Sequence, residues 1–498
     1  MLKVGNGPVD IETVHRIATT PQKAVLSSFS KRKVKKTRKA IEKVVLNKEI
    51  VYGVTTGFGA FKNTAIEQDQ VKELQENLIK SHAVGVGNPL PEETVRAIIF
   101  IIANYLSKGY SGVRPIVIET LLKMLNKNVI PVVPEKGSVG SSGDLAPSAH
   151  IMLVLIGKGR ATYNGKEMDG KVALKKAEIK PVILEAKEGL ALINNTSTMS
   201  AIGSLTLFKA KKLIAVADVA AALSAEALRA TRKAFDKRIH EIKPHEGQID
   251  TARRMRSLLM GSTMIDDNKT QDQYSIRCLP QIHGAIREAL KYVESVITTE
   301  INSVTDNPLI FKNKNGTVSV ISGGNFHGEP VAIAMDTLGI ALSEIANTSD
   351  RRIASLLDPA TNNGLPAFLT PHGGVNSGMM ILQYTTAALA SENKILAHPA
   401  SVDSIPTSAN VEDLVSMGTI GARKANEILK NVEKVIAIEL LVACQAIDFR
   451  LKQGYKLGKG TKKAYLKIRK IVPFFKKDAI YYPYFEKINH VVYENHFI

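Results

Sequence analysis

The chain has 498 residues, 44% hydrophobic and 23% charged, so it can bury a sizeable core and has the composition of a globular protein. Its formal net charge of +19, from 66 basic and 47 acidic residues, raises nucleic-acid binding as an alternative. The densest basic segment, 31–39, has no interleaved aromatic residues, and Val34, Ile41 and Val44 follow helical spacing. It therefore predicts the solvated face of a helix, and nucleic-acid binding is not expected.

Cysteine usage and the N-terminal sequence predict a cytoplasmic protein. Cys278 and Cys444 are too few for a disulfide framework, and neither has a second ligand at metal-binding spacing. The first residues form no apolar run typical of a secretion signal. The uncharged stretch 189–208 is too rich in Asn, Ser and Thr for a membrane span. We expect no metal site and no membrane association.

The first part of the chain predicts a mixed head. Glycine-rich turns recur at 53–59, 85–87, 109–112 and 137–143. Between them, a helix is expected to begin at Pro91 and to end near Gly109. A small β element is expected between Lys158 and Lys187. This head is assigned to an N-terminal domain of residues 1–190.

The rest of the chain predicts long helices. Apolar residues follow helical spacing with few breakers over five stretches: 198–235, 275–305, 328–358, 377–397 and 411–451. Patterns of this length indicate a helix bundle, assigned to residues 191–498, and the fold class is mainly α. The sequence from Gly458 to Thr461 weakly matches a phosphate-binding loop and is interpreted as a linker.

The segment 137–147, which reads Gly-Ser-Val-Gly-Ser-Ser-Gly-Asp-Leu-Ala-Pro, carries the most chemical information. Its simplest interpretation is a Gly/Ser turn before a helix. It lacks the Lys-Ser or Lys-Thr pair of a P-loop and the Gly-x-Ser-x-Gly spacing of a nucleophile elbow. Adjacent serines also occur in amidases with a Ser-Ser-Lys arrangement, although the flanking residues differ here.

A more specific interpretation of this segment is an internal ring. In a tight bend, the amide nitrogen of Gly143 can attack the carbonyl carbon of Ser141, because glycine has no Cβ to obstruct the approach. Loss of one water closes a five-membered ring, and loss of a second from Ser142 leaves an exocyclic methylene. The product, 4-methylideneimidazole-5-one (MIO), is an electrophile that no ordinary side chain provides.

Segments over nearly the whole chain resemble, in order, those of the aromatic amino acid ammonia-lyases, and most closely the histidine-specific members. The matching segments are 52–59, 77–82, 141–144, 192–196, 271–278, 306–308, 322–330 and 408–413. The family usually has Ala-Ser-Gly where this chain has Ser141-Ser142-Gly143, and the first of these residues gives only its carbonyl to the ring. The resemblance implies autocatalytic MIO formation and no diffusible cofactor.

The resemblance implies three catalytic residues. Ser142 would supply the methylene carbon to which the substrate amine adds, which divides one difficult step into easier ones. Tyr52 would remove the β-proton as the general base. Tyr274 would assist ring formation or proton handling.

It also implies a set of binding residues. Arg277 would hold the substrate carboxylate through a forked contact. Asn194 and Asn307 would bond the ring carbonyl and nearby groups. Gln271 and Phe326 would line the pocket.

Two further residues would select the substrate. His82 follows Ser81, a pair typical of histidine-specific members, and Glu412 would accept a hydrogen bond from the substrate imidazole. The implied reaction is the non-oxidative elimination of ammonia from L-histidine to give trans-urocanate, the first step of histidine degradation.

The sequence departs from the family pattern at four positions near the substrate end. Asn195 and Ser197 replace the common Gly and Gln of an Asn-Gly-Thr-Gln motif. Val411 and Leu414 replace a common Gln and a common His. These changes bear on specificity, so a phenylalanine or tyrosine ammonia-lyase or an aminomutase stays open. A serine hydrolase acting through Ser142 and a non-catalytic homologue also stay open.

The resemblance finally implies a homotetramer in which long helices of four subunits pack together. Each active site would then combine residues from three chains. L-histidine is the expected small-molecule partner.

Overall fold

Helices dominate the computed structural model, as the sequence predicts. The structure describes residues 1–498 except 48, 50, 58–65, 68–69, 314, 316 and 494–498. Phe58 and Gly59, which end the predicted tyrosine loop, therefore lie outside the described residues. In the part of the chain that is described, no helix is both long enough and apolar enough for a membrane span.

The chain forms two compact units. Unit 1 comprises Met1–Phe208, Glu294–Asp336 and Pro399–Arg423, and unit 2 comprises Lys209–Val293, Thr337–His398 and Lys424–Ile498. The predicted domain division at residue 190 stays a prediction. The first boundary between the two compact units lies between Phe208 and Lys209, within a long helix.

Unit 1 holds several short paired strands. β1 (Leu2–Val4) pairs in parallel with β2 (Ala24–Leu26). The antiparallel pairs involve β3 (Val86–Pro89) with β5 (Pro134–Lys136), β4 (Ile130–Pro131) with β6 (Arg160–Tyr163), β6 with β7 (Lys166–Asp169), and β8 (Leu309–Lys312) with β9 (Val318–Ile321). The β element predicted between Lys158 and Lys187 is present only in part, because Gly170–Lys176 forms helix α7.

Unit 1 also contains a series of helices. They are α1 (Ile11–Thr19), α2 (Ser28–Leu46), α3 (Val71–His82), α4 (Glu92–Ser107), α5 (Pro115–Asn126), α6 (Leu145–Leu155), α7 and α8 (Glu188–Ile193). The predicted helix from Pro91 is α4, and the basic segment 31–39 lies in α2. Arg38 in that segment is buried, however, because its guanidinium donates to the carbonyls of Gly112 and Ala186.

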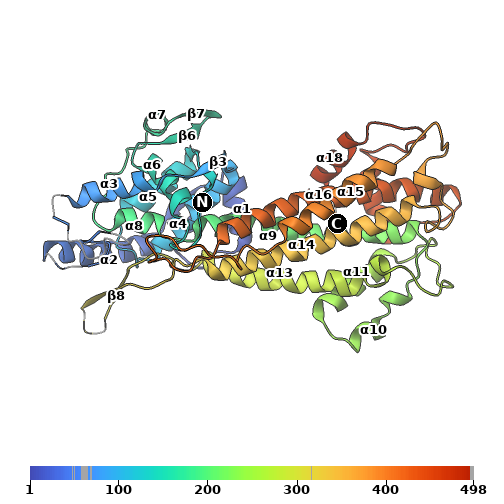
Figure 1. Ribbon diagram of the computed structural model, residues 1–498, viewed down its shortest axis with the longest axis horizontal. Helices are drawn as coiled ribbons and strands as arrows, with labels where there is room; N and C mark the ends of the chain where they lie inside the picture. The colour runs from blue at the N-terminus through green and yellow to red at the C-terminus, as the bar shows by residue number, and fades with distance from the viewer. Residues whose placement is uncertain are drawn as a thin grey trace. The chain divides into compact units, whose positions relative to one another are not determined.

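The long helices form most of unit 2 (Figure 1). They are α9 (Ser197–Ala227), α13 (Leu279–Ile301), α14 (Glu329–Leu357), α15 (Met380–Leu396) and α16 (Gly418–Lys452). Shorter elements accompany them: η2 (Lys233–Phe235), α10 (Lys237–Glu241), α11 (Glu246–Leu258), α12 (Tyr274–Arg277), η3 (Ala367–Leu369), α17 (Lys459–Arg469) and α18 (Tyr482–Val491). Residues of α9, α13, α14 and α16 occur in both units.

Three sequence expectations about helix ends need correction. α9 ends at Ala227 rather than near Phe235, and Arg229 just beyond it has a left-handed backbone. The helix expected from Val411 begins only at Gly418, because the preceding residues form a tight turn. The segment from Gly458 to Thr461, expected to be a linker, instead begins helix α17. Gly458 directly precedes the helix, and its backbone N–H donates to the Glu226 carboxylate.

Candidate active site

The glycine-rich loop before α6 is bent at two glycines. Gly140 and Gly143 both have φ of +70°, a conformation that side chains disfavour. A Cβ on Gly143 would lie 2.2 Å from the carbonyl oxygen of Asn195, so only glycine fits there. The loop therefore has the tight bend at Gly143 that the ring interpretation requires.

Hydrogen bonds fix both sides of this bend. The Asp144 N–H donates to the Asn195 carbonyl at 2.6 Å, and the Asp144 carboxylate accepts from Ser138, from Thr419 and from the Met199 N–H. Burial raises the pKa of Asp144 even though these donors oppose the shift.

Gly140, earlier in the same loop, is also held by hydrogen bonds. The Gly140 carbonyl accepts from the Gly328 N–H at 2.9 Å and from the Ser416 hydroxyl at 2.8 Å. The loop is thus held by segments that are distant in the sequence.

Asn194 supports the loop from the end of α8. It is 4% exposed, and its Nδ2 donates to the Ser142 carbonyl at 2.7 Å. α8 begins after Lys187, which has a left-handed backbone with φ of +73°. Asn194 is therefore placed by a short helix whose two ends are both fixed.

A buried ion pair joins this helix to the segment that carries Asn307. Lys187 Nζ lies 2.8 Å from Asp306 Oδ2, and both side chains are fully buried. Burial lowers the pKa of Lys187 and raises that of Asp306, and their mutual attraction opposes both shifts. Asp306 Oδ1 accepts from the Asn307 N–H at 2.6 Å. The pair therefore fixes the two asparagine segments relative to each other.

The side chain of Asn307 is held in turn by the loop after β9. Its Nδ2 donates to the Ser322 hydroxyl at 3.2 Å, and its Oδ1 accepts from the Gly323 N–H at 2.7 Å. Phe326 follows in the same loop and is half-buried.

Glu412 reaches the loop from a tight turn. The backbones of Thr407 and Glu412 pair in an antiparallel bridge. Oε2 of Glu412 accepts from the Ser141 hydroxyl at 2.5 Å, and Oε1 accepts from the Ser142 hydroxyl at 2.6 Å. The carboxylate thus bonds to both serines of the sequence motif.

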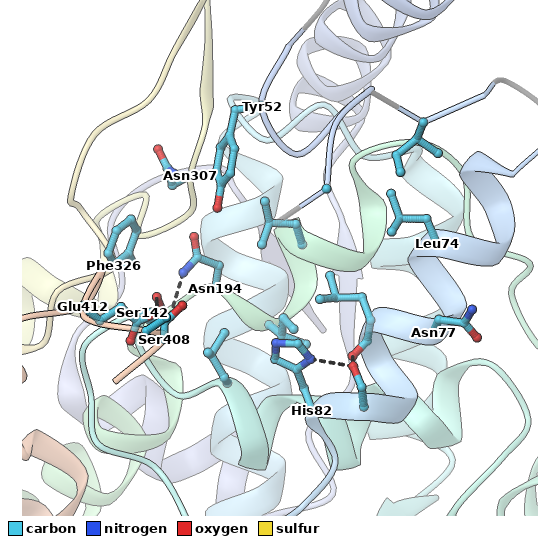
Figure 2. Close-up of a pocket in the computed structure, with 18 residues that line it drawn as sticks. Tyr52, Leu74, Asn77, His82, Ser142, Asn194, Asn307, Phe326, Ser408 and Glu412 are labelled. Carbon is cyan, nitrogen blue, oxygen red and sulfur yellow. Dashed lines mark hydrogen bonds between the residues drawn. The ribbon is translucent and has the colours of Figure 1, made fainter. Parts of the chain in front are cut away.

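These residues line one cavity of about 800 Å³ (Figure 2). Tyr52, His82, Ser142, Asn194, Asn307, Phe326 and Glu412 all contribute to its walls. Tyr52 extends into it from a loop, hydroxyl end foremost. A cavity of about 630 Å³ is lined by several of the same residues together with Ser141, Val411 and Leu414. Of the twelve site residues that the sequence predicts, eight from unit 1 line these cavities, and Gly143 lies in the same loop as Ser141 and Ser142.

His82 lies at the end of α3, and its Nδ1 is 3.0 Å from the Ser81 hydroxyl. Burial lowers the pKa of His82, although a hydrogen bond with the Leu78 carbonyl and the charge of Glu412 oppose the shift. Burial therefore favours the neutral imidazole of His82, which can both donate and accept a hydrogen bond.

The other three predicted residues belong to unit 2 and contact one another. Arg277 donates to Gln271, and its guanidinium lies 4.9 Å from the centre of the Tyr274 ring. Tyr274 is 68% exposed and Gln271 is also exposed. Neither they nor Arg277 line the two cavities described above.

Sequence reasoning missed three groups at this site. The Ser141 hydroxyl bonds to Glu412, although only the Ser141 carbonyl was expected to matter. Thr407 donates to the same Glu412 oxygen at 3.0 Å. Lys187 is the third, and nothing in its own segment signals a partner more than a hundred residues away; its pair with Asp306 follows only from the fold.

Comparison with known proteins identifies the family. Residues 9–470 match the model of a family described as aromatic amino acid lyase. A histidine ammonia-lyase of Alkaliphilus oremlandii is 56% identical over 460 residues, which cover 92% of this chain and 90% of that protein.

Solved structures of other proteins share the fold. A histidine ammonia-lyase of Trypanosoma cruzi superposes with a TM-score of 0.91 at 41% identity, covering 99% of this chain and 93% of the other. A phenylalanine aminomutase of Pantoea agglomerans gives a TM-score of 0.94 at 36% identity, covering 100% and 99%. The extent of these matches leads to one conclusion: this chain belongs to the aromatic amino acid lyase family.

Proposed function

We propose that this protein is a histidine ammonia-lyase, which converts L-histidine to trans-urocanate and ammonia. The observation that carries the proposal is the meeting of Ser142, Tyr52, His82 and Glu412 in one cavity. The relative that is 56% identical has the same activity in its name, and the aminomutase structure shows that the fold alone does not fix the reaction.

The residues of the loop fit an MIO group formed from Ser141-Ser142-Gly143. The backbone at Gly143 has no room for a side chain, and Asn194 donates to the carbonyl of Ser142, which would become the ring carbonyl. A donor at that oxygen draws electrons from the ring and favours electrophilic character. When formed, the group supplies an electrophilic carbon that turns the substrate amine into a better leaving group.

The remaining steps belong to side chains of the cavity. Tyr52 is proposed to remove the β-proton as the general base, from a loop at the cavity wall. His82 and Glu412 are proposed to recognise the imidazole ring by hydrogen bonds, which a phenyl ring could not return. Asn194 and Asn307 would hold the reacting groups, and Phe326 would exclude water from one wall.

We further propose that the protein is a homotetramer with shared active sites. Gln271, Tyr274 and Arg277 form an exposed cluster in unit 2, whereas the cavity is lined by unit 1. A cluster supplied by a neighbouring chain would bring Arg277 to the substrate carboxylate and Tyr274 to the ring. Full activity in a monomer obtained by dilution would contradict this arrangement.

The function is tested by adding purified protein to L-histidine and following urocanate by its near-ultraviolet absorbance. L-phenylalanine and L-tyrosine run in parallel, and a β-amino acid product is sought by chromatography. We expect urocanate from histidine alone, and an intact mass lower than the encoded mass by about 36 Da, the two waters lost on ring formation.

Glu412→Gln is the matched variant for substrate choice. It is expected to keep the mass loss but to lower kcat/KM for histidine by about 10- to 100-fold, because an amide recognises the imidazole N–H less well than a carboxylate does. A cinnamate or coumarate product with no urocanate would reject histidine as the substrate. An unmodified mass would reject the MIO group.

A further inference from the structure

The Glu412 carboxylate is bound by three hydroxyl groups. Ser141 and Thr407 donate to Oε2, at 2.5 and 3.0 Å, and Ser142 donates to Oε1 at 2.6 Å. Ser141 is only 3% exposed, so water has little access to its hydroxyl. The two carboxylate oxygens therefore have different partners.

The turn that carries Glu412 has an uncommon backbone. Ser408, Ala409 and Asn410 have φ of 52°, 52° and 63°, three successive left-handed residues of which none is glycine. Such residues are disfavoured and persist only where surrounding contacts hold them. The bridge between Thr407 and Glu412 closes the turn, and the hydroxyl contacts to Oε2 hold its side chain.

Ring formation would remove a hydrogen-bond donor from one oxygen of the Glu412 carboxylate but not from the other. One water would carry away the carbonyl oxygen of Ser141 together with the amide hydrogens of Gly143 and Ser142, as the Gly143 nitrogen bonds to the Ser141 carbonyl carbon and that carbon forms a double bond to the Ser142 nitrogen. The second water carries away the Ser142 hydroxyl together with the Ser142 α-hydrogen. Oε1 of Glu412 then loses its donor, whereas the Ser141 and Thr407 hydroxyls on Oε2 remain.

We propose that Ser141 is a positioning residue for substrate recognition. Its hydroxyl, together with that of Thr407, holds Oε2 so that Oε1 faces the cavity and accepts from the imidazole N–H of the substrate. This inference rests on the proposed function and deepens it, because the serine that stands where the family usually has alanine gains a role.

The test is Ser141→Ala, which keeps the backbone atoms that form the ring. We expect the same mass loss of about 36 Da as in the wild type. Loss of one hydrogen bond to a charged group should raise KM for L-histidine about 5- to 20-fold and change kcat less than about 3-fold. The Kd of urocanate, measured by titration calorimetry without turnover, should rise by a similar factor.

Three further variants complete the design. Thr407→Val removes the other donor to Oε2 and should raise the same KM and Kd, and it tests the proposal even if Ser141→Ala fails to fold. Ser141→Thr keeps the hydroxyl and should restore binding. Ser204→Ala is the matched control, because it removes a buried hydroxyl that donates within α9, and it should change neither constant.

Each outcome bears on a separate conclusion. If the wild type makes urocanate but Ser141→Ala and Thr407→Val bind it with a Kd within about 2-fold of the wild type, the positioning role is wrong and the function stands. If Ser141→Ala loses the mass change, its hydroxyl serves ring formation instead, which also overturns the proposal. If the wild type makes no urocanate, the proposed function fails first.

Discussion

Two glutamates, one in each unit, are held in opposite ways. Glu439 on α16 in unit 2 is fully buried and accepts from Arg352 Nε at 2.6 Å and Nη2 at 2.9 Å. The hydroxyls of Ser224 and Ser349 donate to the same carboxylate. Glu412 in unit 1 is half-buried and accepts from hydroxyl groups at a cavity.

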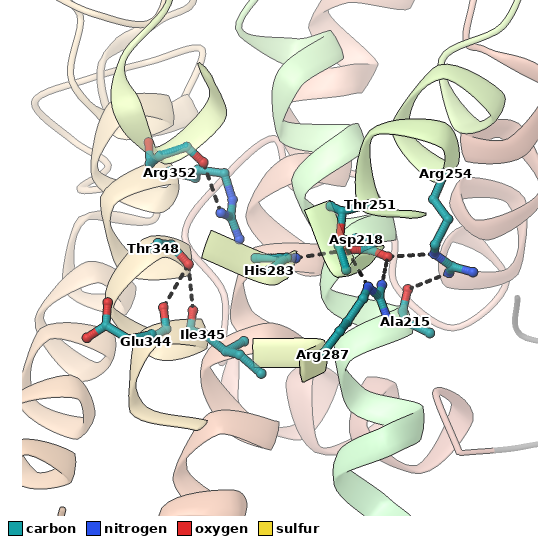
Figure 3. Close-up of polar contacts among 12 residues, drawn as sticks. Ala215, Asp218, Thr251, Arg254, His283, Arg287, Glu344, Ile345, Thr348 and Arg352 are labelled. Atoms are coloured by element: carbon teal, nitrogen blue, oxygen red, sulfur yellow. Dashed lines mark hydrogen bonds and ion pairs between the residues drawn. The ribbon is translucent and has the colours of Figure 1, made fainter. Parts of the chain in front are cut away.

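A second carboxylate in unit 2 repeats the Glu439 arrangement (Figure 3). Asp218 on α9 accepts from His283 Nδ1 at 2.9 Å, from Arg254 at 2.6 Å and from Arg287. Burial alone would raise the pKa of Asp218, but the hydrogen bond from His283 and the charges of Arg287 and Arg254 hold it below its ordinary value. Three helices, α9, α11 and α13, meet at this one side chain.

The kind of hydrogen-bond partner separates carboxylates that stabilise the fold from a carboxylate that can bind a ligand. Glu439 and Asp218 in unit 2 are bound by cations on regular helices, so removing one partner leaves a charge buried without compensation. Glu412 is bound by neutral hydroxyls on a left-handed turn, and one of its donors is the serine whose hydroxyl would be lost. The first arrangement contributes to stability, and the second keeps an acceptor available for a ligand.

The largest expected effect comes from Ser142→Ala, which removes the source of the methylene carbon. We expect urocanate formation to fall by at least about 10³-fold, because no other side chain supplies an equivalent electrophile. The intact mass should equal the encoded mass, and the melting temperature should change little. Ser204→Ala, the control, should keep both activity and mass loss. Retained urocanate formation in Ser142→Ala would remove Ser142 from the mechanism.

The next largest effect is expected when each of the two glutamates is replaced by glutamine and the free energies of unfolding are compared. Glu439→Gln leaves Arg352 buried beside a neutral amide, and we expect a loss of about 3 kcal/mol or more in the free energy of unfolding. Glu412→Gln should cost no more than about 1 kcal/mol, because its partners are neutral hydroxyls. Urea unfolding at fixed protein concentration measures both. Equal losses would show that Glu412 is also a structural carboxylate.

The long helices of unit 2 could be predicted from the sequence, because their buried residues recur at helical spacing over many turns. The start of α16 could not. Apolar residues continue back to Val411, but the backbone is left-handed at Ser408 and Ala409, which rarely adopt that conformation, and again at Met417 directly before the helix. Long-range contacts, which no local pattern encodes, impose that turn.

The site was predictable only where local chemistry or resemblance marked it. The Gly/Ser segment at 140–143 predicts a tight bend from its composition, and the structure has a positive φ at Gly140 and Gly143. The pairing of Lys187 with Asp306 has no such signature in the sequence, since a lysine in a polar segment ordinarily faces solvent. The burial of Arg38 escaped prediction for the same reason.

The smallest effect concerns the pH dependence of stability through His283. This histidine is fully buried, and burial lowers its pKa, although the hydrogen bond and charge of Asp218 oppose the shift. The unfolded chain, with an ordinary pKa of about 6.5, gains a proton below that pH that the folded protein does not take up. Stability should therefore be fully present above pH about 6.5 and decline by up to about 1.4 kcal/mol per pH unit as the pH falls toward the folded pKa.

His283→Asn isolates this contribution, because an amide can still donate to Asp218 but does not titrate. The variant should be less stable than the wild type at pH 7, yet its free energy of unfolding should fall less steeply between pH 6.5 and pH 5.5. His372→Asn changes an exposed histidine of unit 2 and should leave the wild-type slope in place. Parallel slopes for the wild type and His283→Asn would mean that the folded protein protonates His283 as readily as the unfolded chain does. The carboxylate of Asp218 would then hold a charged histidine as a third cation beside Arg254 and Arg287.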